Sequence, residues 1–559
     1  MTIRELVDNA AKRFPERPAY HFRQKDGAWL GVRYCEYRSR VRVVAEIAGQ
    51  LDLKPHQDTV ALAMENRPEW IEAYAGLAYC GITVVPLDPK LKPGEVEYIL
   101  RDSGAVAVFS TEAMRGTLAE VLPRVGAVRA VVLVDAAADP APCAGIKTYG
   151  YEALQDKFYL QTRAGDSFAA ANEPAEDDVA SVIYTSGTTG RPKGAMLTHG
   201  NFCSDVESAV QAIDSFRSTD RFIVVLPLFH AFSFLTNFLL PMRVGACMQF
   251  AGSLRSLGED MKLLGPSIMM GVPLLFEKLL AKVEAGVRKS APARFLKSLG
   301  LDSILRRRVR KALGGRLRLL ITGGAPCSPE TIAGFAHYGI TLVEGYGLTE
   351  CAPIVSVTIP SDPHPGSIGP AMPGIEVRIA DPDASGIGEL QVRGANVMKG
   401  YLRDEAATAE AFTPDGWFRT GDLATMDADG CLYIRGRAKS LIVNREGKNI
   451  YPEEVELCLA NDPLVRDFLV LGVREPGETG ERVGAIIVPD LDAFMESNGG
   501  AEPPWPEIEA TLRRHLQEAC AKLADYKHPR KVEIRREPLE RTAAQKICRH
   551  AYEGALDGR

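Results

Sequence analysis

Several features that mark common classes of protein are missing from this chain. Residues 1–14 are polar and amphipathic, so the chain lacks the apolar N-terminal segment that a signal peptide needs. One long uncharged run, residues 222–242, is interrupted by Pro227 and Pro241. A membrane-spanning helix needs about 20 mostly apolar residues, so these interruptions indicate a buried strand and helix instead. We therefore expect a cytoplasmic protein.

Paired metal-binding cysteines and a surplus of positive charge are also missing. The 11 cysteines are scattered without a spacing such as C-x2-C, and an odd number cannot all pair within one chain. We expect reduced thiols. The formal net charge of -6 at pH 7 gives no overall attraction to nucleic acid, which proteins bind largely through Lys and Arg. A nucleic-acid partner is therefore not expected.

The length of 559 residues indicates more than one domain, because single hydrophobic cores stop growing at roughly 250–300 residues. Between residues 179 and 357, short apolar runs alternate with longer helical patterns, which predicts an α/β arrangement. One such run, LRLLITGG, is followed by Ser328, which can cap a helix that has Pro329 at its first position. Junctions of this kind bind ligands in α/β folds.

Two smaller units are predicted further along the chain. Residues 384–436 are rich in glycine and turn residues, and the segments GELQVRG and CLYIRG predict strands of a small β subdomain. The last 120 residues or so predict strands together with helices that begin at Pro452 and Trp505, a combination typical of a small α+β domain. We predict an α/β fold with a large N-terminal domain of several subdomains and a small C-terminal α+β domain. The predicted boundaries are 1–436 for the large domain, 437–439 for a hinge and 440–559 for the small domain.

A basic segment lies between residues 288 and 318. It contains the string RRRVRK at residues 306–311, with several apolar residues before it. A helix of this kind could contact an anionic membrane surface. The more common explanation is a basic helix face in water, and both interpretations stay open.

The run YTSGTTGRPKG at residues 184–194 carries the strongest chemical signal. It places three glycines among four Ser and Thr residues and two cations, directly after the apolar strand VASVIYT. Glycine allows backbone N–H groups to approach an anion, and hydroxyl groups donate to phosphate oxygens. A flexible surface loop is the alternative. The run is not a Walker loop, because neither GKS nor GKT occurs in the chain, which weakens kinase and GTPase interpretations.

This run resembles the phosphate loop of the adenylate-forming superfamily, which includes acyl-CoA synthetases, firefly luciferases and the adenylation domains of peptide synthetases. The resemblance implies that Thr185 takes part in catalysis and in binding Mg²⁺. The residues that it implies for nucleotide binding in this loop are Thr185, Ser186, Gly187, Thr188, Thr189, Gly190 and Lys193.

The run YGLTE at residues 346–350 is similar to the superfamily's second nucleotide motif. The resemblance implies that the Tyr346 ring stacks on adenine, that Thr349 contacts the α-phosphate, and that Glu350 holds Mg²⁺ and is catalytic. A carboxylate oxygen suits this hard cation. Further nucleotide-binding residues implied by this motif and by the similar GGAP segment are Gly323, Gly324, Ala325, Glu344, Gly345 and Gly347.

Two later runs complete the resemblance on the nucleotide side. DGWFRTGD at residues 415–422 matches the motif whose last residue, Asp422, accepts both ribose hydroxyls, a role that suits a carboxylate with two acceptor oxygens. YIRGRAK at residues 433–439 matches the next motif, in which Arg437 binds ribose or phosphate and Lys439 occupies the hinge. Five strings in the superfamily's order make the resemblance specific.

Near the C-terminus, RTAAQKI at residues 541–547 resembles the segment that carries the catalytic and nucleotide-binding lysine, here Lys546. Members of the superfamily often have glycine before this lysine, whereas this chain has Gln545. A cation is useful at this point, because attack of a carboxylate on the α-phosphate brings two anions together. Without the resemblance, a lysine so near the C-terminus would be assigned to the solvated surface.

The loop REGKNIYPEEVE at residues 445–456 resembles the one that moves against the acyl site in the second half-reaction. The resemblance assigns coenzyme A contact to Gly447, Lys448 and Asn449. A turn followed by the helix that Pro452 begins is the simpler interpretation, and both can hold.

The run PLFHAF at residues 227–232 lies where the superfamily's acid pocket begins. Relatives that activate amino acids usually place an aspartate here, because a buried ammonium group needs a carboxylate partner. No carboxylate is present, which favours an acid without an α-amine. His230 is assigned a catalytic and pocket role by resemblance, although a core histidine is the alternative. The implied acyl-pocket residues are His230, Phe234, Gly271, Val272, Gly324 and Gly347.

The resemblance implies a two-step acyl-CoA synthetase that uses ATP, Mg²⁺ and coenzyme A. A carboxylic acid, fatty rather than aromatic or alicyclic in our first hypothesis, would form acyl-AMP and pyrophosphate, and coenzyme A would then take the acyl group. The small domain would rotate about the hinge between the two steps. Alternatives are transfer to a carrier-protein phosphopantetheine and a non-catalytic nucleotide sensor. The state of assembly, monomer or homodimer, and membrane association stay open.

Overall fold

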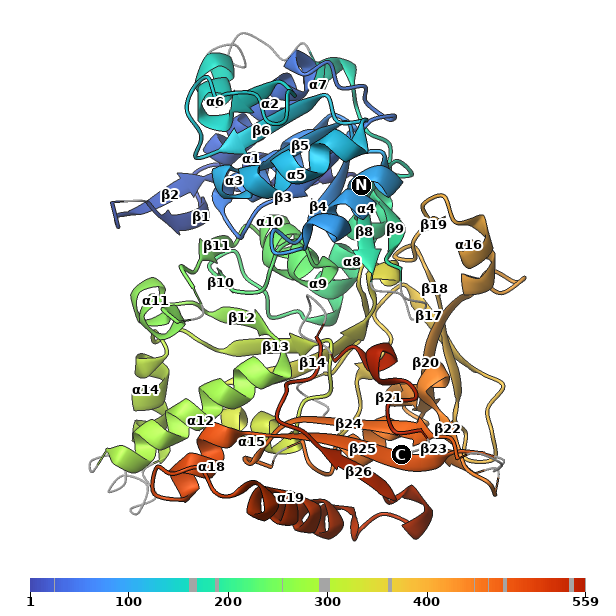
Figure 1. Ribbon diagram of the computed structural model, residues 1–559. Coiled ribbons are helices and arrows are strands. Elements are labelled where there is room, and N and C mark those ends of the chain that lie inside the picture. Colours follow the sequence, from blue (N-terminus) through green and yellow to red (C-terminus); the bar gives the residue numbers. More distant parts are fainter. Residues whose placement is uncertain are drawn as a thin grey trace.

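A computed structural model describes most of the chain, and Figure 1 shows its arrangement. The described residues are 1–24, 26–159, 168–185, 191–253, 255–290, 302–359, 364–446, 448–460, 462–475, 480–541 and 547–557. Two large sheets with helices on their faces make up most of the N-terminal part, and the C-terminal residues form a smaller unit next to the second sheet. The predicted fold class is therefore confirmed.

The first sheet has eight strands in the order β19-β9-β8-β4-β3-β5-β6-β7. Its middle strands are parallel, whereas β9 runs antiparallel to both β8 and β19. The strands are β3 (Thr59–Ala63), β4 (Thr83–Leu87), β5 (Ala107–Thr111), β6 (Ala130–Val134), β7 (Thr148–Gly150), β8 (Val179–Thr185), β9 (Lys193–Thr198) and β19 (Gly400–Tyr401).

Helices cover both faces of this sheet. Successive strand residues point to opposite sides, and because both sides carry apolar residues, each side packs against helices. Val60 and Leu62 belong to the same hydrophobic cluster as α2 and α3, whereas Ala61 and Ala63 belong to the cluster of α4 and α5. The helices of this part are α1 (Ile3–Arg13), α2 (Tyr34–Gln50), α3 (Pro68–Tyr79), α4 (Pro93–Ser103), α5 (Arg115–Val125), α6 (Tyr151–Tyr159) and α7 (Phe168–Ala171).

The second sheet also has eight strands, in the order β15-β14-β13-β12-β10-β11-β1-β2. Three parallel strands of this sheet, β10, β12 and β13, coincide with short apolar runs between residues 179 and 357, where the sequence predicts an α/β arrangement. The strands are β1 (Pro18–Arg23), β2 (Trp29–Arg33), β10 (Arg221–Val224), β11 (Cys247–Phe250), β12 (Ile268–Gly271), β13 (Leu319–Gly323), β14 (Thr341–Gly347) and β15 (Ile354–Val357).

One face of the second sheet packs against helices, and the other faces the first sheet. Met269 and Leu320 cluster with α11, α12, α14 and α15, whereas Ile268 and Ile321 join the large cluster between the sheets. The Ser328 side chain accepts a hydrogen bond from the Thr331 N–H, which confirms the predicted cap. The helices of this part are α11 (Leu257–Leu264), α12 (Pro273–Lys289), α14 (Asp302–Ala312) and α15 (Pro329–His337).

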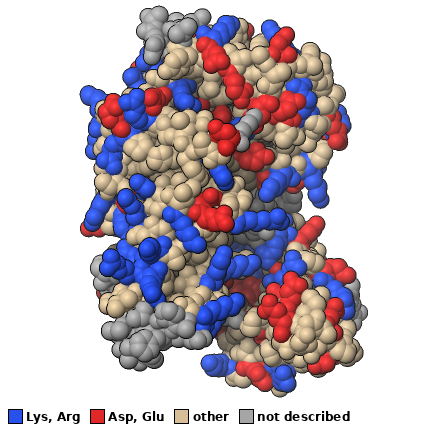
Figure 2. Space-filling model, turned by 90° about the vertical axis from the view of Figure 1, so that its left-hand side faces the viewer, with Lys and Arg blue, Asp and Glu red and all other residues tan. Residues whose placement is uncertain are grey.

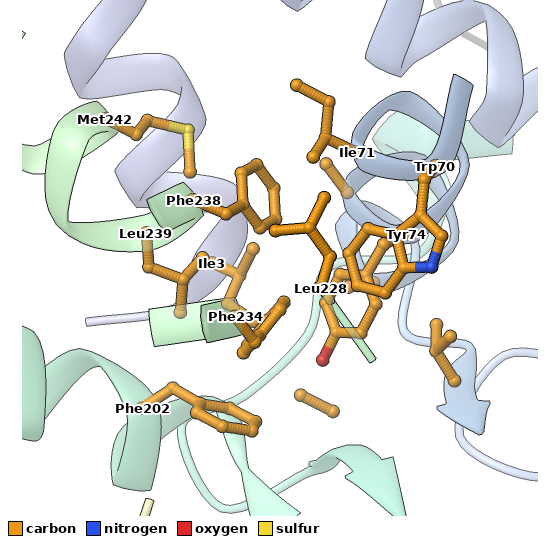
Figure 3. Packing of buried hydrophobic residues seen from close by; sticks show 14 of the residues in the cluster. Ile3, Trp70, Ile71, Tyr74, Phe202, Leu228, Phe234, Phe238, Leu239 and Met242 are labelled. Carbon is orange, nitrogen blue, oxygen red and sulfur yellow. The ribbon is translucent and has the colours of Figure 1, made fainter. Parts of the chain in front are cut away.

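The uncharged run at residues 222–242 lies in the core between the two sheets, as the sequence predicts. After β10 it forms α9 (Ala231–Phe234), the π-helix η2 (Leu235–Leu239) and the start of α10 (Leu240–Val244), beside α8 (His199–Ala212). Figure 3 shows its Phe234 and Phe238 among side chains from α1, α3 and α8. Among the described residues, no helix has both the length and the apolar character needed to cross a membrane.

A small antiparallel sheet of five strands, ordered β16-β21-β20-β18-β17, confirms the predicted β subdomain. Its strands are β16 (Gly369–Pro370), β17 (Ile375–Ala380), β18 (Gly388–Gly394), β20 (Phe418–Met426) and β21 (Cys431–Arg437), with α16 (Glu405–Ala411) nearby. The chain leaves this sheet at Arg437 and passes through the short helix η4 (Ala438–Ser440).

The C-terminal unit has the predicted α+β composition. Ile508, Leu512 and Leu516 of α19 recur at helical spacing and pack in one cluster with Val470 and Ile487. Its elements are β22 (Ile442–Val443), β23 (Asn449–Ile450), α17 (Pro452–Glu456), β24 (Val465–Val473), β25 (Arg482–Pro489), α18 (Leu491–Ser497), α19 (Trp505–Cys520) and β26 (Lys531–Ile534).

Candidate active site

A large cleft lies between the second sheet, the β subdomain and the C-terminal unit, with a volume of about 4640 Å³. It opens at the carboxyl ends of β13 and β14, where ligands bind in α/β sheets. Sixteen of the predicted site residues line it: Thr185, Lys193, His230, Val272, Gly323, Gly324, Ala325, Glu344, Gly345, Tyr346, Gly347, Thr349, Glu350, Asp422, Arg437 and Lys439.

Seven predicted site residues lie outside the described residues. They are Ser186, Gly187, Thr188, Thr189, Gly190, Gly447 and Lys546. The chain on either side of Lys546 reaches the cleft, because Arg541 and Ile547 form a β-bridge with each other and both line the cleft.

The two ends of the predicted phosphate loop are fixed by a hairpin. Thr185 at the end of β8 pairs with Lys193 at the start of β9. The Tyr184 hydroxyl donates to Asp102 Oδ2 at 2.6 Å, and burial together with this carboxylate raises the pKa of Tyr184. The loop therefore joins two antiparallel strands rather than a strand and a helix.

Tyr346, Asp422 and Arg437 form one hydrogen-bonded group. The Tyr346 hydroxyl donates to Asp422 Oδ2 at 2.6 Å, and Arg437 Nε donates to Asp422 Oδ1 at 2.7 Å. Asp422 and Arg437 face each other on β20 and β21, so the hairpin register brings the two predicted residues together. Burial raises the pKa of Tyr346, which keeps its hydroxyl a donor.

Glu350 lies in the short helix η3 (Thr349–Cys351), in the connection between β14 and β15. Its Oε1 accepts a hydrogen bond of 3.0 Å from the Tyr401 hydroxyl. Lys193 Nζ lies 5.3 Å from the centre of the Tyr401 ring, so the metal-binding candidate and the phosphate hairpin share one neighbour. Carboxylate and hydroxyl oxygens from Glu350 and Thr185 are the donors that Mg²⁺ prefers.

Glu344 is a buried carboxyl group of the predicted site, and burial dominates its titration. It is 8% exposed, and its Oε1 accepts a hydrogen bond of 3.1 Å from the Cys327 N–H. Burial raises the pKa of Glu344 to about 7, and the Cys327 N–H only partly opposes this. Near neutral pH this carboxyl group is therefore only partly ionised.

The structure corrects part of the predicted acyl pocket. Phe234 is 2% exposed and does not line the cleft, because its ring packs 4.4 Å from Tyr74 and 4.8 Å from Phe202 in the core (Figure 3). Gly271 does not line the cleft either. A Cβ at this position would lie 2.6 Å from the Phe276 ring, so the glycine allows α12 to pack on β12.

Lys448 and Asn449 are also outside the cleft lining. Lys448 Nζ lies 2.6 Å from a Glu446 carboxylate oxygen and 4.6 Å from the centre of the Tyr526 ring. In this arrangement of the chain, the Lys448 side chain therefore contacts its own domain, whereas Tyr451 and Glu453, further along the predicted loop, line the cleft.

Sequence reasoning missed two residues of the cleft. Phe232 lines it, and a Cβ on Gly323 would lie 3.6 Å from the Phe232 ring. Phe232 occurs in the quoted run PLFHAF, but the sequence does not show which aromatic residue of a helical turn faces the cavity. Tyr401 follows β18 by several residues, and nothing in its neighbourhood signals a contact with Glu350.

Comparison with known proteins agrees with this geometry. A family described as "AMP-binding enzyme" matches residues 7–402, and "AMP-binding enzyme C-terminal domain" matches residues 454–546. The chain belongs to the AMP-binding enzyme family. The resemblance to the adenylate-forming superfamily is thereby confirmed.

Named relatives of this AMP-binding enzyme are long-chain-fatty-acid–CoA ligases. The chain is 30% identical to ligase 6 of Mus musculus over 545 residues, which covers 90% of this chain and 75% of the relative. It is 31% identical to the ligase of Salmonella typhimurium, which covers 99% of this chain and 94% of the relative. Among solved structures, ATP-bound MatB from Rhodopseudomonas palustris has 27% identity and a TM-score of 0.75, with 100% of both chains covered.

Proposed function

We propose that this chain is an AMP-forming acyl-CoA synthetase that activates a carboxylic acid. Among fatty, aromatic and alicyclic acids, we propose a fatty acid as the substrate. The observation that carries the proposal is the meeting of four separate motifs in one cleft, around the Asp422–Arg437 pair and the Glu350–Tyr401 pair. The names of the relatives support coenzyme A as the acyl acceptor.

The cleft suits a nucleotide on the side of β14. Gly347 has no room for a side chain, since a Cβ would lie 1.8 Å from the Pro353 carbonyl oxygen, and Gly324 adopts φ +84°. The Gly347 contact allows β14 to pack against the chain after it, whereas at Gly324, which lines the cleft, the missing side chain would let a flat base approach the backbone. Adenine would lie on Tyr346 beside Gly323, Gly324, Ala325, Glu344 and Gly345, and the ribose hydroxyls would donate to the remaining lone pairs of Asp422, with Arg437 next to them.

The phosphate side is formed by the β8–β9 hairpin. We assign the β- and γ-phosphates to Thr185, Lys193 and the loop at residues 186–190, and the α-phosphate to Thr349. Mg²⁺, when bound by Glu350 and Thr185, would neutralise phosphate charge. The substrate carboxylate would attack the α-phosphate and pyrophosphate would leave. Lys546 would stabilise the negative charge that develops at the α-phosphate in this step.

The acyl side lies beyond Gly324 and Gly347. His230 and Val272 line it, and we add Phe232 in place of Phe234. No carboxylate occurs in the run at residues 227–232, so a substrate ammonium group would lack a buried partner there. This supports a substrate acid without an α-amine.

The two half-reactions need different catalytic groups on one face. We propose that residues 1–436 form a large domain and that residues 440–559 form a smaller one. The smaller domain would turn as a unit about Lys439, in the hinge between them. Such a turn would remove Lys546 after adenylation and bring Gly447, Lys448 and Asn449 to the cleft for coenzyme A. The present position of Lys448, against Glu446, is compatible with the adenylation arrangement.

We also propose that the protein contacts a membrane surface peripherally through α14. Arg306, Arg307, Arg308 and Lys311 are exposed on α14, and Ile304 on the same helix is 45% exposed. Figure 2 shows Lys and Arg side chains gathered on the face of the molecule that carries this helix. Such a face would attract an anionic lipid surface.

The proposed function is tested by a panel of fatty, aromatic and alicyclic acids with MgATP and coenzyme A, scored by AMP release and by the mass of the thioester. We expect AMP and acyl-CoA in equal amounts with at least one class of acid. Acyl-AMP that accumulates without regard to coenzyme A would favour a carrier-protein acceptor instead. ATP binding without AMP release from any acid would contradict an enzymatic function.

A further inference from the structure

The connection that carries Glu350, between β14 and β15, is held by three side chains that no nucleotide motif includes. They are Asp205 of α8, Asn396 after β18 and Tyr401 of β19. Asp205 is 0% and Asn396 1% exposed, so both are placed in the interior rather than at the cleft surface. A buried polar side chain is retained where it satisfies other buried polar groups.

Asp205 and Asn396 bind the backbone of this connection from two sides. Asp205 Oδ2 accepts a hydrogen bond of 2.9 Å from the Ile354 N–H, and Asn396 Nδ2 donates to the carbonyl oxygens of Cys351 at 2.9 Å and of Ile354 at 3.1 Å. Between them, Ala352 adopts φ +62°, which residues other than glycine rarely adopt. A strained residue of this kind persists where its surroundings fix it.

Glu350 itself is held at its main chain and at its side chain. The Met398 N–H donates to the Glu350 carbonyl oxygen at 2.8 Å, and the Tyr401 hydroxyl donates to Glu350 Oε1 at 3.0 Å. The segment of residues 396–401 therefore fixes both the position and the direction of the Glu350 carboxylate.

The segment that holds Glu350 is anchored in turn to the first sheet and to α8. Asn201 Nδ2 donates to the Ala395 and Val397 carbonyl oxygens at 2.7 and 2.9 Å. Tyr401 pairs with Ala195 of β9, the strand that continues from the phosphate hairpin. One chain of contacts thus links Glu350 to the strand that carries Lys193.

We infer that Asp205, Asn396 and Tyr401 are positioning residues, which hold the Glu350 carboxylate in place for a divalent cation bound with ATP. The inference rests on the proposed function, because it takes Glu350 as the metal-binding residue. A partner that orients a ligating carboxylate typically contributes about 10–100-fold to metal affinity. Tyr401 has the most direct effect, since it contacts the carboxylate itself.

The test measures ATP affinity by calorimetry in two conditions, with excess Mg²⁺ and with EDTA, in the absence of any acid so that no turnover occurs. Tyr401→Phe removes only the hydroxyl. We expect it to lower the affinity for ATP in Mg²⁺ by about 10-fold and to leave the affinity in EDTA unchanged. Tyr433→Phe is the matched control, because its hydroxyl also donates to a carboxylate, Asp427 Oδ2 at 3.0 Å, outside the cleft lining.

The backbone contacts are tested by conservative and disruptive pairs. Asp205→Asn keeps an acceptor oxygen for the Ile354 N–H and should retain the Mg²⁺-dependent affinity, whereas Asp205→Ala should lose it. Asn396→Ala should behave like Asp205→Ala. Should the alanine variants not fold, Tyr401→Phe still decides the question, because it removes one hydroxyl and keeps the shape of the original side chain.

Three outcomes would contradict the inference. One is a Tyr401→Phe variant with wild-type affinity in Mg²⁺. Another is an equal loss in Mg²⁺ and in EDTA, which would assign Tyr401 to general ATP contact. The third is a Glu350→Gln variant that keeps the full Mg²⁺ effect. An enzyme that binds MgATP as expected but forms no acyl-CoA from any acid would instead contradict the proposed function and leave the positioning role standing.

Discussion

Replacement of Glu344 by glutamine should stabilise the protein at neutral and higher pH. Burial raises the pKa of Glu344 from an ordinary value of 4.5 to about 7. Between these two values the folded state keeps a proton that the unfolded state has released, so stability falls as pH rises through this range. The difference of about 2.5 between the two pKa values corresponds to a destabilisation of about 3 kcal/mol. The folded protein bears this whole cost above pH 7 and none of it below pH 4.5.

Glutamine resembles the protonated carboxyl group in shape and can still accept the hydrogen bond from the Cys327 N–H. The assay is urea unfolding of the nucleotide-free protein from pH 4.5 to pH 8.5, for wild type and for Glu344→Gln. We expect equal stability at the acid end and a variant more stable by about 2–3 kcal/mol at pH 8. Glu120→Gln, at an exposed position on α5, is the control and should show no such divergence.

A difference between wild type and Glu344→Gln that is independent of pH would refute the reasoning. It would show that the variant changes packing rather than the proton balance. A variant less stable at pH 8 would refute it more directly, because a neutral side chain would then be worse than an ionised one in this place. Measurement without nucleotide keeps the result separate from any contact between Glu344 and ATP.

Three further predictions concern other parts of the chain. Phe234→Ala should lower the free energy of unfolding by about 3–5 kcal/mol without changing the order of preferred acids, whereas Phe232→Ala should change that order, as an acid panel and urea unfolding would show. Lys546→Ala should slow acyl-AMP formation by about 100–1000-fold and leave transfer from supplied acyl-AMP to coenzyme A intact, so a normal adenylation rate would contradict its role. Combined replacement of Arg306 and Arg307 by glutamate should abolish sedimentation with anionic vesicles, and unchanged sedimentation would exclude this face as the contact.

The described residues that the sequence assigns to the nucleotide side line one cleft, and each group of them comes from a short continuous run. Tyr346 lies near the end of β14 and Glu350 in the connection that follows, and Asp422 and Arg437 lie on adjacent strands of one hairpin. Local sequence determines such turns and hairpins, so the residues within each run lie close in space, although the runs themselves are far apart in the chain. The runs at residues 184–194 and 415–422 are informative for this reason.

The acyl side is predicted less well, because it depends on how a helix is rotated about its axis. Residues 232 and 234 are both phenylalanine, and two positions in a helix differ in direction by about 200°. Only the packing of Phe234 against Tyr74 and Phe202 decides that Phe232 is the one at the cleft. The sequence contains both aromatic residues but not the partner that selects between them.

Long-range contacts explain the remaining differences. Tyr401 is 51 positions from Glu350, and Asp205 is 149 positions from Ile354, so no local pattern connects them. The helix that Pro452 begins is short and ends at Glu456. The Glu456 carboxylate accepts a hydrogen bond of 2.8 Å from the Val470 N–H of β24, which ties the end of the helix to the sheet.

The directions of the Tyr346 and Glu350 side chains follow from the geometry at the end of β14 and in the connection after it. The pairing of β14 with β15 shifts register between Tyr346 and Gly347, and such a shift redirects the side chains that follow it. Tyr346 then points to Asp422, while Glu350 points to Tyr401. The shift is possible because Gly347 lacks a Cβ, which would otherwise lie 1.8 Å from the Pro353 carbonyl oxygen. One glycine therefore allows a short stretch of chain to direct the Tyr346 ring to Asp422 and the Glu350 carboxylate to Tyr401.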